Sequence, residues 1–156
     1  MYFRVGCWLA IMLLGHGLVC AQAAGEYDHI RWQFSSLKQA GSEWKLLFTA
    51  VIDPGWHLYS QSTPEGGPMP VRFVFSRPKG YRLIGKVKEV GTIRRGYDEV
   101  FLVDVLWYED NVIFTQDVKV TVKEGKRMVA GEITYSVCSG ELCEPGSIRF
   151  NLEVGN

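Results

Sequence analysis

The stretch Ile133-Thr-Tyr-Ser-Val-Cys-Ser-Gly-Glu-Leu-Cys-Glu-Pro145 predicts a β-hairpin that carries one cysteine on each arm. Residues 133–138 alternate between two sets of side chains, as the two faces of a strand do. The short connection that follows contains Gly140, which can adopt a positive φ at little cost. Apolar residues alternate again over residues 148–154, so we expect the second arm of the hairpin there.

This hairpin places Cys138 and Cys143 opposite one another where the two arms leave the turn. Opposed residues of antiparallel strands have Cα atoms about 4.5–5.5 Å apart, and a disulfide requires roughly 4.4–6.8 Å. A bond across so short a loop removes little entropy from the unfolded chain, and exposed bonds of this kind are reduced easily. Two interpretations stay open: a structural bond, the commoner use of a single pair, and a redox-active bond.

The beginning of the sequence has the features of a secretory signal peptide: a basic residue, a long apolar run and the cleavage motif Ala21-Gln-Ala23. We expect residues 1–23 to be removed and residues 24–156 to form a single periplasmic or secreted domain without a transmembrane span. Lipid anchoring at Cys20 is the less favoured alternative, because Val19 is a poor match to the small residue that precedes a lipidated cysteine.

The overall charge of the sequence is balanced, with 17 Lys and Arg residues against 17 Asp and Glu residues. Such a surface gives no reason to expect nucleic acid as a partner. An exported protein meets an oxidising environment, so the cysteine pair rests as a disulfide until a reductant reaches it. We expect the protein to be a monomer.

The chain from Ile30 onward has the alternation of β-strands, and no segment has a helical period. We expect strands over residues 30–34, 44–52, 71–75, 81–90, 101–107, 112–114, 118–122, 128–137 and 148–154. Arg94 and Arg95 lie between two of these segments and are expected in a solvated loop. Short strands separated by Pro, Gly, Asn and Asp predict an all-β sandwich or barrel.

One segment is unusual for a plain sandwich, since Trp56, His57 and Tyr59 follow the turn at Asp53-Pro-Gly55. Packing at strand edges explains such aromatic residues. Alternatively they form, with Tyr135, the wall of a pocket beside the cysteine hairpin.

Other chemistries have little support in the sequence. Neither His29 nor His57 has a sequence context that marks a catalytic base, so no hydrolytic triad can be assembled. The C-x4-C spacing differs from that of zinc sites and has no second ligand pair. We expect no metal and no cofactor.

The segment Gly131-Glu-Ile-Thr-Tyr135 leading into Cys138, followed by Cys143-Glu-Pro145, resembles the active-site hairpin of the amino-terminal periplasmic domain of the thiol:disulfide interchange protein DsbD. The segment Ile52-Asp-Pro-Gly-Trp-His-Leu-Tyr59 resembles a second recurrent segment of that family. The likeness extends over residues 44–154.

The resemblance implies an immunoglobulin-like sandwich, with the cysteine pair on a hairpin near one edge, that acts by thiol–disulfide interchange. That family takes electrons from a membrane-embedded relay through a thioredoxin-like domain. It passes them to oxidised partners such as disulfide isomerases and cytochrome c maturation proteins. The resemblance implies that Cys143 forms the mixed disulfide with a partner protein and that Cys138 is the resolving cysteine. The sequence contains neither relay nor thioredoxin-like segment, so we expect a stand-alone protein with separate partners.

The family also covers its cysteines with a cap loop that has an aromatic tip beside acidic residues. The best match is the stretch 95–101, which makes Tyr97 or Phe101 the candidate lid and makes Asp98 and Glu99 candidate proton acceptors. Phe101 fits the face of a core strand equally well.

The cysteines are one residue closer together than is usual in that family, and Glu144 replaces a tyrosine after the second one. Because Glu141 and Glu144 flank the pair, we expect a sluggish free thiol that is activated when a partner docks. The alternative function is a non-catalytic immunoglobulin-like binding module, in which the disulfide pins the hairpin and aromatic residues such as Trp56 and Tyr59 bind a glycan or protein.

Overall fold

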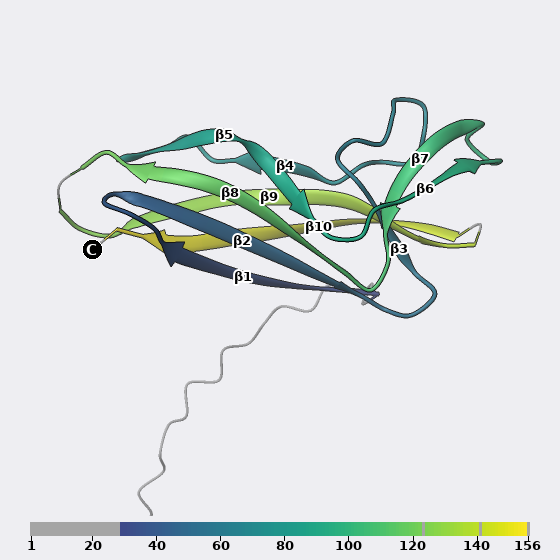
Figure 1. The fold of residues 1–156 in the computed structure, drawn as a ribbon, viewed down its shortest axis with the longest axis horizontal. Coiled ribbons are helices and arrows are strands. Elements are labelled where there is room, and N and C mark those ends of the chain that lie inside the picture. Colours follow the sequence, from purple (N-terminus) through teal and green to yellow (C-terminus); the bar gives the residue numbers. More distant parts are fainter. Residues whose placement is uncertain (1–28, 123, 141, 156) are drawn as a thin grey trace, which may run out of the picture.

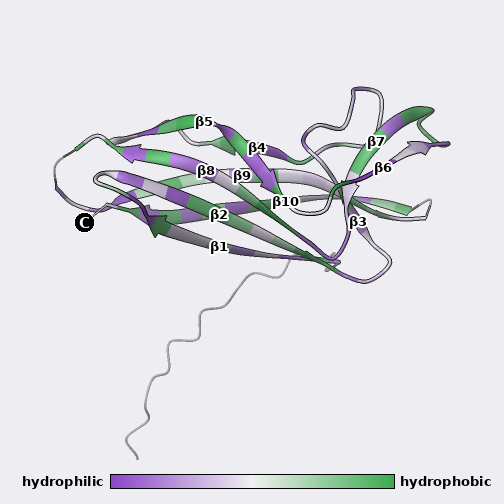
Figure 2. Ribbon diagram, viewed as in Figure 1, coloured by the Kyte–Doolittle hydropathy of each residue, from purple (hydrophilic) through white to green (hydrophobic). Residues whose placement is uncertain are grey.

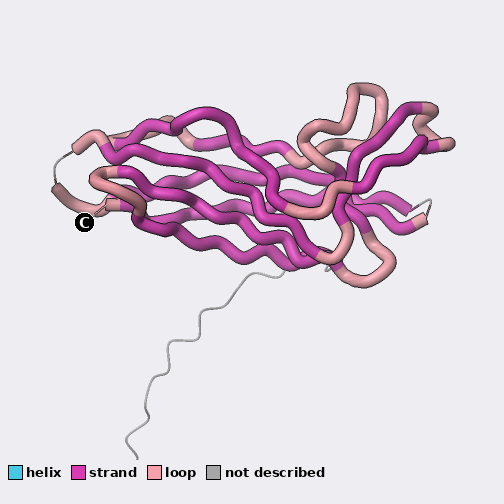
Figure 3. Tube along the Cα trace, viewed as in Figure 1, coloured by secondary structure: helices cyan, strands magenta, loops and turns pink. Residues whose placement is uncertain are grey.

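The computed structural model describes residues 29–122, 124–140 and 142–155 (Figure 1). Within these residues the chain forms ten β-strands joined by loops and no helix (Figure 3). The expected signal peptide, residues 1–23, and the alternative anchor Cys20 lie outside the described residues. In the described part of the chain, no helix is long and apolar enough to cross a membrane.

The strands, in chain order, are β1 (Ile30–Lys38), β2 (Glu43–Ile52), β3 (His57–Tyr59), β4 (Arg72–Phe75), β5 (Tyr81–Val90), β6 (Arg94–Asp98), β7 (Val103–Tyr108), β8 (Asn111–Val120), β9 (Arg127–Ser139) and β10 (Leu142–Val154). They form a four-stranded sheet in the order β1-β2-β8-β5 and a six-stranded sheet in the order β10-β9-β3-β7-β6, in which β4 also pairs with β9. Paired strands run antiparallel. The predicted immunoglobulin-like β-sandwich is confirmed, and the cysteine hairpin β9–β10 lies at one edge of the larger sheet.

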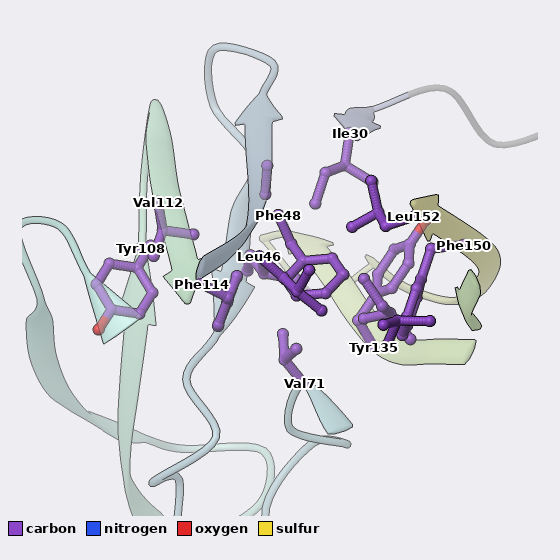
Figure 4. Packing of buried hydrophobic residues seen from close by; sticks show 14 of the residues in the cluster. Ile30, Leu46, Phe48, Val71, Tyr108, Val112, Phe114, Tyr135, Phe150 and Leu152 are labelled. Carbon is purple, nitrogen blue, oxygen red and sulfur yellow. The ribbon is translucent and has the colours of Figure 1, made fainter. Parts of the chain in front are cut away.

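The main core lies between the two sheets and is built mainly from the apolar faces of β2, β8, β9 and β10. Buried and less buried residues alternate along β8, and the strand carries both hydrophobic and hydrophilic residues (Figure 2). Phe48 on β2 and Phe114 on β8 are register partners, and both are fully buried. Phe48 also meets Phe150 of the opposite sheet with ring centroids 4.8 Å apart, and it lies at the centre of the cluster in Figure 4. Each such ring contributes about 1.5–3 kcal/mol through burial.

The strand β8 corrects one sequence-based expectation, since residues 112–114 and 118–122 were expected to form separate strands. Gln116 between them is polar yet only 2% exposed. Its side-chain amide donates hydrogen bonds to the carbonyl oxygens of Ile84 and Asp117. Because those bonds satisfy the buried amide, the strand continues through it.

The hairpin of β6 and β7 corrects two further expectations. Arg94 and Arg95, expected in a loop, are the first residues of β6 and pair with Trp107 and Leu106. Phe101, expected on a strand, lies in the turn, since β7 begins only at Val103. Both differences arise because the pairing of β6 with β7, rather than the alternation within either segment, determines where these strands form and end.

The short strand β3 links the two sheets of the sandwich. After β2 the chain turns at residues 53–56 and crosses into the larger sheet, where β3 pairs with β9 on one side and β7 on the other. This crossing places His57 directly opposite Cys138. The same sheet therefore brings together the two segments that the sequence marked as unusual.

Candidate redox site at the cysteine hairpin

The hairpin β9–β10 holds a disulfide between Cys138 and Cys143. The two residues are register partners, with Cα atoms 4.1 Å apart and an S–S distance of 2.04 Å. Gly140 in the turn has φ of 58°, a left-handed conformation that glycine adopts without the steric cost of a Cβ. The predicted hairpin and its cross-strand disulfide are confirmed.

The two cysteines differ in accessibility. Cys138 is 0% exposed, because β9 lies inside the sheet between β10 and β3. Cys143 is exposed, because β10 lies at the edge of the sheet. A thiolate from solvent therefore reaches the Cys143 end of the bond first, and Cys138 is the sheltered leaving group.

A small cluster, separate from the main core, covers the buried cysteine. Cys138 packs with Tyr59, which is 3% exposed, and Val105, which is 4% exposed. The partly buried side chains of Val103 and Trp107 pack against them. We call these five residues the cysteine cluster. It lies at the end of the sandwich from which the β6–β7 hairpin projects (Figure 1).

A chain of polar side chains runs from β3 to the β6–β7 hairpin. His57 Nε2 lies 3.0 Å from the hydroxyl oxygen of Tyr59, and that hydroxyl donates to Asp98 Oδ2 at 3.4 Å. Because residues two apart on a strand share a face, His57 and Tyr59 face the same side of the sheet as Cys138.

Burial is the main influence on the protonation of His57 and Tyr59. Desolvation lowers the pKa of His57, and the negative charges of Glu109 and Asp98 oppose that shift only in part. Burial, followed by the charge and hydrogen bond of Asp98, raises the pKa of Tyr59 to about 12. At neutral pH the imidazole and the phenol are therefore both neutral.

The candidate cap is the tip of the β6–β7 hairpin. Asp98 Oδ1 accepts hydrogen bonds from the backbone N–H groups of Val100 at 2.9 Å and Phe101 at 3.1 Å. Phe101 is 37% exposed and lies at this tip, and Tyr97 on β6 and Glu99 in the turn are also exposed. Asp98 thus connects the turn to Tyr59 in the cysteine cluster through its two carboxylate oxygens.

Two of the expected wall residues lie elsewhere. Tyr135 is on the opposite face of β9 from Cys138, buried in the main core with its ring 5.5 Å from that of Trp32. Strand alternation explains this position, since the two residues are three apart. Trp56 also packs against the main core and stacks on His29, with ring centroids 3.6 Å apart.

The sequence analysis missed Val105 and Trp107 as part of the site. Both were expected on a core strand, and they do share a face of β7. That face covers Cys138 rather than filling the space between the sheets. Their two-residue spacing in the sequence indicated a shared face of one strand. The sequence did not indicate which strand lies next to that face.

Glu144, expected to disfavour the thiolate, lies next to Cys143 on β10 and turns toward the other face of the strand. Its Oε2 atom is buried without a hydrogen-bond partner, 4.0 Å from Nε2 of His29. The other ring nitrogen of His29 lies 3.7 Å from Asp53. Among the described residues, no three His, Cys, Asp or Glu side chains are arranged to hold a metal ion.

The carboxylate of Glu89, which the sequence did not single out, anchors the segment that follows β3. Glu89 at the end of β5 accepts hydrogen bonds from the Ser60 hydroxyl at 2.7 Å, the Gln61 backbone at 2.7 Å and the Tyr108 hydroxyl at 2.9 Å. Burial and the neighbouring Glu89 raise the pKa of Tyr108. These bonds hold the end of β3 to the opposite sheet and so keep Tyr59 in place.

Comparison with known proteins identifies a family that this chain matches. Residues 27–154 match the family model described as thiol:disulfide interchange protein DsbD, N-terminal. A search of curated proteins found no match.

Two solved structures have a similar fold. The N-terminal periplasmic domain of ScsB from Proteus mirabilis is 19% identical, with a TM-score of 0.62, and the match covers 84% of this chain and 49% of that chain. The chain thus spans about half the length of that protein's structure. The DsbD N-terminal domain of Neisseria meningitidis, in its reduced form, is 16% identical, with a TM-score of 0.50, and the match covers 79% of this chain and 86% of that chain. The chain belongs to the family of DsbD N-terminal domains.

Proposed function

We propose that this protein is an exported electron carrier that exchanges its disulfide with thiol proteins. The observation that carries the proposal is the asymmetry of the pair, with Cys143 exposed at the sheet edge and Cys138 fully buried. Such a bond has one attackable sulfur and one protected sulfur, which is the arrangement that directional exchange requires.

The reaction is a two-electron exchange in each direction. A partner thiolate attacks Cys143 Sγ, the S–S bond breaks, and Cys138 leaves as a thiolate. A second partner thiol then attacks the mixed disulfide, so that the partner becomes oxidised and this protein becomes a dithiol. In the reverse direction, the Cys143 thiolate attacks the disulfide of an acceptor, and Cys138 displaces the acceptor as a dithiol.

The proposed donors are thioredoxin-like proteins fed by a membrane electron relay. The proposed acceptors are oxidised envelope proteins such as disulfide isomerases or components of cytochrome c maturation. Family membership supports an exchange reaction in general, and the apolar tip of the β6–β7 hairpin supports docking of a protein partner. At this tip Val100 is 69% exposed and Leu102 is 68% exposed.

Trapping of the mixed disulfide tests the roles of the two cysteines. Each single-cysteine variant is first converted by dithio-bis-nitrobenzoate to its mixed disulfide with thionitrobenzoate. It is then incubated with a reduced thioredoxin-like protein whose resolving cysteine is replaced, so that the partner thiolate attacks the protein sulfur and thionitrobenzoate leaves. The mixture is alkylated and run on a non-reducing gel. We expect a covalent complex with Cys138→Ser and none with Cys143→Ser. Equal trapping by both variants, or trapping by neither, would contradict the assigned roles.

The alternative of a glycan- or protein-binding module depends on aromatic side chains that face solvent. Tyr59 is 3% exposed, and Trp56 is stacked on His29, so neither ring presents a free face of that kind. A redox titration separates the two functions. A midpoint below about −300 mV would mark a structural bond, whereas a value near that of thioredoxin marks a carrier.

A further inference from the structure

His57 occupies the position opposite the sheltered cysteine. His57 and Cys138 are Cα partners across β3 and β9, so their side chains leave the same face of the sheet. Directly opposed residues have Cβ atoms about 4.5–5.5 Å apart, so the side chains of His57 and Cys138 are neighbours on that face. The imidazole is therefore a neighbour of Cys138 rather than of the exposed Cys143.

The hydrogen bonds favour one tautomer of the imidazole. Tyr59 has one hydroxyl proton, and it donates this proton to Asp98 Oδ2. Between His57 Nε2 and the Tyr59 oxygen, 3.0 Å apart, the nitrogen must then be the donor. In the neutral ring the proton lies on Nε2, and Nδ1 carries the free lone pair.

Groups on the neighbouring strands favour a transient positive charge on this ring. Asp98 from β6 acts through Tyr59, and Glu109 follows β7. Glu109 itself is held by Trp107 Nε1 at 3.0 Å and by Arg94 at 3.7 Å. Burial keeps the resting imidazole neutral, while the two carboxylates stabilise the imidazolium once a proton arrives.

We propose that His57 is the base that removes the thiol proton of Cys138 when the mixed disulfide is resolved. The inference rests on the proposed exchange function. Nδ1 accepts the proton, and the Cys138 thiolate attacks Cys143 Sγ. The intramolecular S–S bond forms, the bond from Cys143 to the acceptor breaks, and the electron pair leaves on the acceptor sulfur. That thiolate takes up the proton from His57, directly or through water. In the opposite direction, the imidazolium protonates the departing Cys138.

The test uses dithio-bis-nitrobenzoate, a small disulfide that releases a coloured thiolate. The reduced protein without the expected signal peptide, residues 1–23, has Cys138 and Cys143 as its cysteines and is mixed with one equivalent in a stopped-flow instrument. The first phase reports attack by Cys143, and the second reports resolution by Cys138. No physiological partner is needed, so the result is independent of partner identity.

In the unsubstituted protein we expect the second phase to accelerate with pH up to the pKa of His57, below its ordinary value, and then to level off. In His57→Gln, whose amide can still donate to Tyr59 but cannot accept a proton, we expect the second phase near neutral pH to slow by about 100-fold. Its rate should then rise about tenfold per pH unit with the fraction of thiolate. The first phase should remain unchanged.

The control is His29→Gln, which replaces the histidine stacked on Trp56 and should alter neither phase. A second phase without an inflection in the unsubstituted protein, or equal slowing of both phases in His57→Gln, would overturn the role of His57. Failure of the reduced protein to show either phase would overturn the exchange function itself. The pH profile of the unsubstituted protein keeps the inference testable even if His57→Gln does not fold.

Discussion

The two faces of β9 lie in different surroundings. One face carries Ile133, Tyr135 and Val137, which are buried between the sheets in a core of aromatic and aliphatic side chains. The other carries Cys138, which is equally buried but lies against a histidine, a tyrosine and the β6–β7 hairpin. Burial alone therefore does not identify the site, because the reactivity of a buried side chain depends on the residues that contact it.

The largest effect is expected on the core face. Phe48→Ala removes a fully buried ring that packs against Phe73 and Phe150. We expect the free energy of unfolding to fall by about 3–5 kcal/mol, measured by chemical denaturation. The matched control is Phe101→Ala at the exposed hairpin tip, with an effect within about 0.5 kcal/mol. Similar losses for both variants would contradict the separation of core and site.

Reduction of the disulfide should have a smaller effect. The bond joins residues only five apart in sequence, so the entropy of loop closure amounts to about 2 kcal/mol. We expect the protein to stay folded in dithiothreitol with that loss, measured by denaturation with and without reductant. Unfolding on reduction would show instead that the bond supports the main core.

Substitution of Glu89, which anchors the end of β3, tests whether this anchor affects the cysteine face of β9. Glu89→Gln weakens the two hydrogen bonds from Ser60 and Gln61 at the end of β3 and the one from Tyr108 on β7. We expect the free energy of unfolding to fall by about 1 kcal/mol. We also expect faster alkylation of the reduced Cys138, because Tyr59 is less firmly held over it. Glu99→Gln in the exposed turn is the control, and equal behaviour of the two variants would exclude this coupling.

A further effect is expected at alkaline pH. The pKa of Tyr59 rises from 10.0 to about 12 in the folded protein, so folding favours the protonated phenol. The stability from this group is present below pH 10.0 and is lost as the pH rises toward about 12. Relative to the unsubstituted protein, Tyr59→Phe should therefore lose less stability over that window, as measured by denaturation at each pH. Parallel losses in both proteins would contradict the assignment.

Much of this architecture was predictable from local patterns. Alternation along residues 133–138, together with Gly140, predicted the hairpin and its disulfide. Those features depend on neighbours in the chain, so the sequence contains their full cause. The same reasoning failed at Tyr135, because alternation indicates that two faces exist without indicating which one meets the cysteine cluster.

The chain's own residue order thus specified an all-β protein with a cysteine on each arm of a hairpin. Only the assembled sheets decided that His57, Tyr59 and Asp98 meet beside Cys138, and that Cys143 is the accessible member of the pair. The reason is that β3 inserts between β9 and β7, a pairing across distant segments whose register depends on the packing of the whole sandwich.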